Sequence, residues 1–150
     1  MDSKHRAGER LLSAWLTLSS TLWNERMVTG MTFNEAFVCN LLTRQAREAP
    51  DLPLTATDLC ERTRLLKSQM NKVLSEMEKK GYLQRLRSDK DKRQIFLRLT
   101  EAGEAAYARE HAGITAILDQ LVSDLGEEKA LAAADMVDEI SACLKKITTP

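Results

Sequence analysis

The 150-residue chain lacks several features that define specialised classes of protein. Its three cysteines stand at the scattered positions 39, 60 and 143, so the sequence has neither a disulfide framework nor a metal-binding cysteine spacing. No apolar run approaches the roughly 20 residues that a membrane-spanning helix needs. The opening segment, MDSKHRAGER, lacks the apolar core of a signal peptide. We therefore expect a cytoplasmic protein with no membrane partner.

Groups suited to catalysis are also scarce. The only imidazoles are His5, near the end of the chain, and His111, at a position typical of a helix surface. No Ser/Cys–His–acid pattern, glycine-rich phosphate loop or paired metal-ligand motif is present. The sequence thus predicts that the protein is not an enzyme and uses no cofactor or metal.

The chain has no excess of charge of either sign, because 22 Lys+Arg balance 22 Asp+Glu. That balance excludes a histone-like polycation, and an apolar content of 43% excludes wholesale disorder. The charges are nevertheless segregated. Residues 62–98 hold 12 basic and 4 acidic side chains, whereas residues 1–61 hold 6 and 8, and residues 101–150 hold 4 and 10. A basic segment in a neutral protein indicates a local polyanion-binding surface, although a charge run alone is more often a solvated face.

Apolar residues spaced three and four apart predict four helices in the first part of the chain. The first has its apolar stripe over residues 11–23 and is expected to end near Gly30. The second begins at the Thr32–Glu35 pair, a capping-box pattern in which each side chain can bond the other residue's backbone N–H. The third is short and begins at Thr55–Asp58, and the fourth covers Lys67–Lys80 before Gly81, a C-capping glycine.

After the fourth helix the hydrophobic period changes to that of strands. Two strand-like apolar runs, the second strictly alternating, flank the polar stretch 87–94: Tyr82, Leu83 and Leu86, then Ile95, Leu97 and Leu99. This pattern predicts a β-hairpin with a charged tip. Thr100 is a plausible N-cap for a long amphipathic helix that breaks at Gly126. The last helix carries an apolar seam close to a heptad repeat: Leu131, Ala134, Val137, Ile140, Leu144 and Ile147.

Within this order, several short motifs are specific. They are Leu54-Thr-Ala-Thr-Asp-Leu59, then Lys67-Ser-Gln-Met-Asn-Lys-Val73, then Lys80-Gly-Tyr-Leu-Gln-Arg85, and finally Asp91-Lys-Arg93 with Leu97-Arg-Leu-Thr100. With them the chain resembles the MarR family of bacterial transcriptional regulators. The resemblance implies a mainly α fold with a small β-hairpin wing. A winged helix-turn-helix core at 32–100 would be flanked by dimerisation helices at 1–31 and 101–150.

The fourth helix is the expected recognition helix, which enters the major groove of DNA. If its apolar residues face the core, the side chains left outward near its start are those able to pair with bases or phosphates. The predicted contacts are Lys67, Ser68, Gln69, Asn71 and Lys72. The alternatives are helix capping for Ser68 and plain solvation for the two lysines.

The hairpin tip is the second expected contact, because a narrow minor groove attracts cationic side chains. By the resemblance Arg93 enters the groove and Asp91 helps to hold the tip. Arg85 and Arg98 are either phosphate clamps or exposed strand charges that discourage edge pairing. The residues predicted to serve the wing are Arg85, Arg87, Lys90, Asp91, Lys92 and Arg93.

The predicted partners are double-stranded DNA with a pseudo-palindromic operator and a second copy of the chain, since a two-fold dimer reads two half-sites. Family behaviour implies repression relieved by a small, often aromatic, molecule. Candidate lining residues for such an effector are Trp15, Met31 and Phe33, with Trp23 and Met27. Two alternatives stay open: a cysteine-based redox regulator of the same fold, and a helical protein-interaction module without specific DNA binding.

Overall fold

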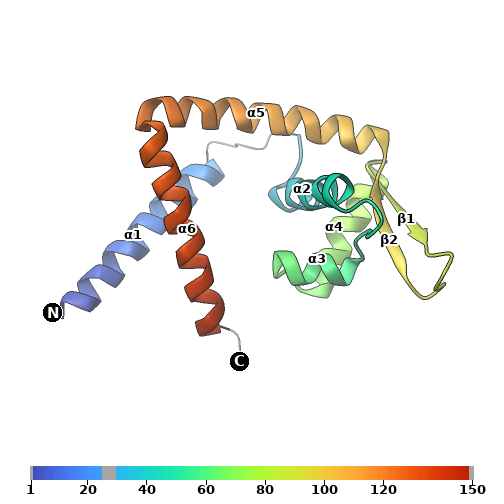
Figure 1. Cartoon of the computed structure of the whole chain (residues 1–150), viewed down its shortest axis with the longest axis horizontal. Helices are drawn as coiled ribbons and strands as arrows, with labels where there is room; N and C mark the ends of the chain where they lie inside the picture. The colour runs from blue at the N-terminus through green and yellow to red at the C-terminus, as the bar shows by residue number, and fades with distance from the viewer. Residues whose placement is uncertain (1, 25–29, 149–150) are drawn as a thin grey trace. The chain divides into compact units, whose positions relative to one another are not determined.

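A computed structural model describes residues 2–24 and 30–148. For residues 22–24 it describes the backbone and not the side chains. Met27 and the side chain of Trp23 therefore lie outside the described residues. The described part is mainly α with one antiparallel hairpin, as predicted (Figure 1). Its elements are α1 (Ser3–Asn24), α2 (Phe33–Glu48), α3 (Ala56–Thr63), α4 (Lys67–Lys79), β1 (Leu83–Arg87), β2 (Ile95–Leu99), α5 (Glu101–Leu125) and α6 (Glu127–Thr148). The chain divides into two compact units, residues 1–112 and 113–150.

Helix α1 begins well before the apolar stripe from which it was predicted. The added segment, Ser3–Arg10, is polar and is rich in residues of good helix propensity. Apolar periodicity cannot detect this segment, because Ala7 is its only apolar side chain and a single residue has no period. The predicted helix was right in type and late in its start, and its expected end near Gly30 follows residues 25–29, which lie outside the described residues.

The start of α2 differs in one respect from the predicted reciprocal capping box. The Thr32 hydroxyl accepts the Glu35 N–H at 3.2 Å, as expected. The Glu35 carboxylate, which is buried, instead accepts two hydrogen bonds from Lys80 Nζ, each at 2.9 Å. A buried carboxylate is stabilised more by an ammonium group than by a backbone N–H. The reciprocal box forms one helix later, between Thr55 and Asp58.

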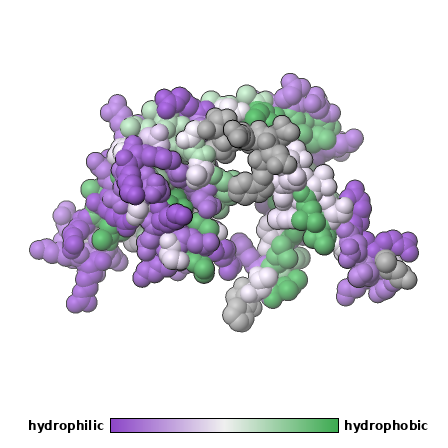
Figure 2. All heavy atoms as spheres, turned by 180° about the vertical axis from the view of Figure 1, so that it is seen from behind, coloured by the Kyte–Doolittle hydropathy of each residue, from purple (hydrophilic) through white to green (hydrophobic). Residues whose placement is uncertain are grey.

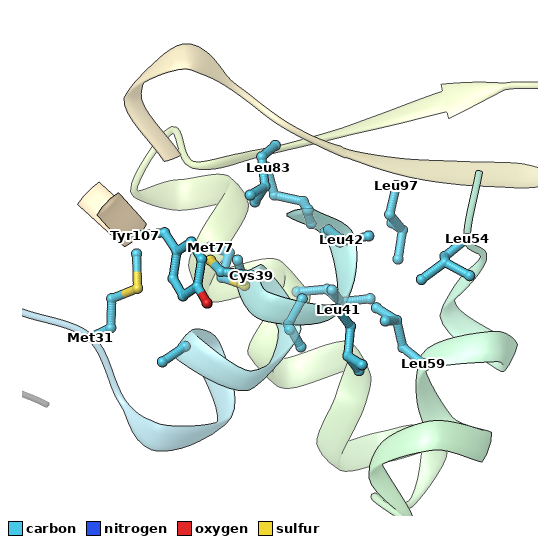
Figure 3. Packing of buried hydrophobic residues seen from close by; sticks show 14 of the residues in the cluster. Met31, Cys39, Leu41, Leu42, Leu54, Leu59, Met77, Leu83, Leu97 and Tyr107 are labelled. Carbon is cyan, nitrogen blue, oxygen red and sulfur yellow. The ribbon is translucent and has the colours of Figure 1, made fainter. Parts of the chain in front are cut away.

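The hydrophobic core lies in the first unit, where α2, α3, α4 and the hairpin converge. The apolar faces predicted for these helices are the buried ones, and Figure 3 shows their side chains meeting between the helices and the hairpin. The largest fully buried side chains are Leu59, Met70, Leu74, Met77, Val38 and Cys39. Because α4 contributes three of them, the core fixes which face of α4 points outward.

The hairpin pairs Leu83 with Leu99 and Arg87 with Ile95. A segment that the sequence did not predict as a strand adds to its edge: Leu97 N–H donates to the Leu54 carbonyl at 2.9 Å. An isolated bridge also joins Thr55 and Phe96. The hairpin root is thus tied to the residues that lead into α3.

The end of α4, the start of β1 and the start of α5 meet at Gly81 and Tyr82. Gly81 adopts the left-handed conformation with φ +75°, the predicted C-cap. Thr100 caps α5 by accepting the Gly103 N–H at 3.0 Å, and its own N–H donates to the Tyr82 carbonyl. Gly103 lies so close to Tyr82 that a Cβ there would collide with the backbone carbonyl oxygen of Tyr82.

The second unit consists of the C-terminal half of α5 together with the whole of α6. Gly126, with φ +91°, separates the two helices. None of the residues of α6 is buried, although it carries the predicted apolar seam. Leu131, Val137, Leu144 and Ile147 are 48–78% exposed, and Figure 2 shows apolar surface along the helix that leads to the C-terminus. No helix in the described residues is both long and apolar enough to cross a membrane.

Candidate nucleic-acid interface

Helices α3 and α4, with the turn between them, form a helix-turn-helix (Figure 1). Arg64 ends α3 in the left-handed conformation with φ 64°, and its N–H donates to the Cys60 carbonyl at 2.9 Å. A non-glycine residue rarely adopts this conformation. Leu66 then stands at the N-cap of α4 and is 68% exposed. The turn therefore presents an arginine and a leucine at two positions where glycine and a polar cap are usual.

All five predicted recognition residues, Lys67, Ser68, Gln69, Asn71 and Lys72, are exposed on one side of α4. Met70, Leu74 and Met77 on the opposite side are fully buried. The Gln69 side-chain oxygen accepts the Leu66 N–H at 2.9 Å, so Gln69 is the residue that caps the helix. Its amide group remains able to donate outward.

The wing tip is an ordered turn that presents its cations to solvent. The Ser88 N–H donates to the Gln94 carbonyl at 3.0 Å, and the Ser88 hydroxyl accepts the N–H groups of Lys90 and Asp91. The Asp91 carboxylate accepts the Arg93 N–H at 3.0 Å. Asp91 therefore shapes the tip, while the side chains of Lys90, Lys92 and Arg93 are exposed.

Two of the predicted wing arginines have partners inside the protein. Arg87 Nη1 donates to the Lys92 carbonyl at 3.2 Å across the base of the tip. Arg85 Nε donates to the Glu78 carboxylate in the last turn of α4 at 2.6 Å. Arg98, by contrast, is exposed on β2. The predicted wing residues thus fall into an exposed group at the tip and a paired group on β1.

Charge at the far end of α4 is also organised. Lys80 follows the helix and bonds the buried Glu35, and this hydrogen bond raises the pKa of Lys80 above its ordinary value. The pair ties the end of α4 to α2. Sequence reasoning missed Glu35, Glu78 and Arg64 as contributors to the site. Glu78 and Arg64 lie within the basic segment, which was their only sequence signal, whereas the sequence marked Glu35 only as a capping residue of the second helix.

Comparison with known proteins identifies this architecture. The model of the MarR family matches residues 29–94, the segment that contains the helix-turn-helix and most of the wing. Over that segment the chain is similar to the MarR family. The chain is also similar to the transcriptional regulator FarR of Neisseria gonorrhoeae, with 30% identity over 84 residues, 56% of this chain and 58% of that protein. The matched segment thus spans less than two thirds of this relative.

Solved structures share this winged-helix fold over almost the whole chain. Streptococcus pneumoniae FabT in complex with DNA superposes with a TM-score of 0.71 and 16% identity, covering 97% of this chain and 100% of that one. NadR in complex with 4-hydroxyphenylacetate gives a TM-score of 0.62 at 24% identity, covering 93% of each chain. These likenesses establish the fold.

The residues predicted to line an effector cleft lie in different environments. Met31 is 6% exposed and belongs to the core beside Tyr107 (Figure 3). Phe33 is exposed at the start of α2, with its ring 6.1 Å from that of Phe37. Trp15 is 60% exposed on α1. Of the three, Phe33 and Trp15 present open surface.

The three thiols are graded in exposure. Cys39 is buried, Cys60 is half-buried and Cys143 is exposed. Burial, reinforced by the negative charge of Glu35, raises the pKa of Cys39 to about 12. A thiol that stays protonated is a poor nucleophile, so Cys39 is unsuited to peroxide sensing. Among the described residues no three His, Cys, Asp or Glu side chains form a metal-binding group.

Proposed function

We propose that this chain is a sequence-specific double-stranded DNA-binding transcriptional regulator that acts as a homodimer. The observation that carries the proposal is the division of α4 into two faces. Three core residues anchor one face, and five polar or basic residues stand exposed on the other, beside a wing tip that displays three cations. An exposed helix face of this composition fits the major groove, and cationic side chains fit the adjacent minor groove.

Dimerisation follows from the unpaired apolar faces. Helix α1 exposes Leu11, Trp15 and Leu18 at 55–60%, and the C-terminal unit exposes its seam along both helices. Contiguous apolar surface on a helix is normally covered by a partner. A second copy of the chain would cover these faces. The dimer would then bring two reading heads, each made of the exposed α4 face and the wing tip, to one pseudo-palindromic site. Sedimentation at micromolar concentration tests this directly, and a monomer would count against the proposal.

The regulatory mode that we propose is repression relieved by a small aromatic molecule. NadR, whose structure holds 4-hydroxyphenylacetate, supports an aromatic ligand class for this fold. A redox mechanism at Cys39 is disfavoured, because that thiol is buried and weakly acidic. A pure protein-interaction module leaves the basic α4 face and wing tip without a role.

The test is selection of genomic DNA fragments by the full chain, followed by titration across salt concentrations. We expect specific binding whose log affinity falls linearly with log salt, because phosphate contacts release counterions. Absence of any selected fragment would favour the interaction module and contradict the proposal.

Two substitutions locate the interface. Arg93→Ala should weaken binding by removing a wing contact. Asn71→Ala should cost roughly 1–3 kcal/mol on the operator and relax base preference if Asn71 pairs with a base. Lys145→Ala, in the last turn of α6, is the control and should leave the affinity unchanged. Equal losses on specific and random DNA for Asn71→Ala would make that residue a phosphate contact.

A further inference from the structure

Arg85 lies on the face of β1 that is turned toward the core. It shares that face with Leu83, and the two residues pair across the hairpin with Leu97 and Leu99, all three leucines being buried. The Arg85 side chain is accordingly only 30% exposed, and its Nε bonds the Glu78 carboxylate at 2.6 Å. The guanidinium therefore reaches inward to the recognition helix.

Glu78 and Arg85 stand on either side of the turn that joins α4 to the wing. The Gly81 N–H donates to the Glu78 carbonyl, and the chain then enters β1 at Leu83. The ion pair thus joins the last turn of α4 to the middle of β1. The wing tip begins at Ser88, about 10 Å farther along the strand. A small rotation of β1 about its root is therefore amplified into a larger displacement of Arg93.

We propose that Glu78 and Arg85 are positioning residues that set the angle between the recognition helix and the wing, and that Arg85 does not bind phosphate. The inference rests on the proposed DNA-binding function. It replaces the phosphate clamp as the role of Arg85. The pair acts on DNA through the placement of the wing tip, so it changes how well both parts of the reading head fit one site.

The proposal makes a prediction whose sign is opposite to that of simple electrostatics. Removing a carboxylate beside a polyanion normally strengthens binding, because one repulsive charge is lost. If Glu78 holds Arg85 in place, removing its charge weakens binding instead. Glu76 provides a matched control, since this carboxylate pairs at 3.3 Å with Lys79 of the same helix and does not reach the wing.

The experiment measures the operator affinity of the full chain for Glu78→Gln, Arg85→Gln, the double variant, the charge exchange Glu78→Arg with Arg85→Glu, and Glu76→Gln. The DNA is the tightest fragment selected by the unmodified chain, and thermal unfolding verifies that each variant is folded. We expect each single substitution at the pair to raise the Kd about three- to tenfold. The Kd of the double variant should not exceed the higher Kd of the two single variants. The charge exchange should recover most of the lost affinity. Glu76→Gln should bind the fragment as tightly as the unmodified chain or more tightly.

A second arm tests whether the effect passes through the wing. In an Arg93→Ala background, Arg85→Gln should add little further loss, because the contact that it positions is already gone. The proposal is overturned if Glu78→Gln binds as tightly as the unmodified chain while Arg85→Gln weakens binding and lowers the salt slope by about one per reading head. That outcome is the signature of a phosphate contact.

A DNA-free measurement separates this inference from the proposed function. Amide residual dipolar couplings report the orientation of residues 83–99 relative to α4. Glu78→Gln should change them and Glu76→Gln should not. If the unmodified chain selects no DNA, the proposed function fails, yet the couplings still decide whether the pair orients the hairpin. Unchanged couplings in Glu78→Gln would refute the positioning role.

Discussion

Gly103 offers the sharpest test of how the reading head is joined to α5. It is buried in the first turns of α5, where a methyl group would meet the backbone of Tyr82. An added Cβ would lie 2.9 Å from the Tyr82 carbonyl carbon and 3.0 Å from its Cα, and closer still to the carbonyl oxygen. The obstacle is backbone, which cannot rotate aside as a flexible side chain can. We therefore expect Gly103→Ala to force α5 away from the root of the wing.

The expected change in the free energy of unfolding combines two destabilising contributions and one stabilising contribution. Overpacking against rigid backbone costs roughly 2–3 kcal/mol, the upper part of the usual range. Displacement of the Tyr82 carbonyl loses its hydrogen bond from the Thr100 N–H, about 1 kcal/mol. Alanine gains about 1 kcal/mol over glycine in a helix interior. The free energy of unfolding should therefore fall by about 2–3 kcal/mol.

Gly113 is the matched control because it lies in the same helix with nothing within 4 Å of a Cβ. Gly113→Ala should raise the free energy of unfolding by about 0.5–1 kcal/mol through helix propensity alone. Urea unfolding of both variants, followed by circular dichroism, measures the two effects with opposite signs. If Gly103→Ala is as stable as Gly113→Ala, the close approach of α5 to Tyr82 is not a constraint and the reasoning fails.

The remaining predictions concern the cap of α4, the thiols and the ion pair at its far end. Leu66→Ser should raise the free energy of unfolding by about 0.5–1 kcal/mol, because an exposed leucine occupies an N-cap with extended φ and ψ that serine favours; a loss in thermal denaturation would contradict this. In thiol labelling at pH 8 with peptide mapping, Cys143 should react in the native chain and Cys39, with its pKa of about 12, only after unfolding; rapid native labelling of Cys39 would reverse the assignment. Lys80→Met should lower the free energy of unfolding by about 1–3 kcal/mol between pH 7 and 9, because it leaves the Glu35 carboxylate without its ammonium partner. The loss should be smaller than for a fully buried pair, because the Lys80 side chain is 40% exposed. Since the pKa of Lys80 is raised in the folded chain, its contribution is complete below about pH 10.4 and is lost as the pH rises through the folded value, so urea titrations should show the gap between variant and unmodified chain narrowing above that pH.

Much of the fold could be predicted because its signals are local. The apolar spacing of Met70, Leu74 and Met77 determines the buried face of α4 and, with it, the exposed face. Gly81 was identifiable as a C-cap because a positive φ favours glycine. The start of α1 was placed late because polar helical turns leave no hydrophobic pattern.

The site was less predictable, because its charged residues are sorted by distant partners. Arg85 and Lys90 are both basic residues of one hairpin, and the local pattern, which places one on a strand and the other at the tip, does not give the partner of either. Arg85 meets a carboxylate from α4, whereas Lys90 stands exposed at the tip. Likewise, the capping pattern predicted correctly that the Thr32 hydroxyl accepts the Glu35 N–H. It did not predict that the Glu35 carboxylate accepts hydrogen bonds from Lys80, 45 residues farther along the chain.

By itself, then, the sequence determined the order and type of the elements, the core-facing residues and the basic character of the segment from α4 through the wing. These properties depend on side-chain periodicity and composition, which involve only residues close together in the sequence. Only the tertiary structure decided which charges are available to a partner and which hold the reading head together. That distinction depends on contacts between residues far apart in sequence, such as Glu35 with Lys80, and on the close backbone approach of Gly103 to Tyr82.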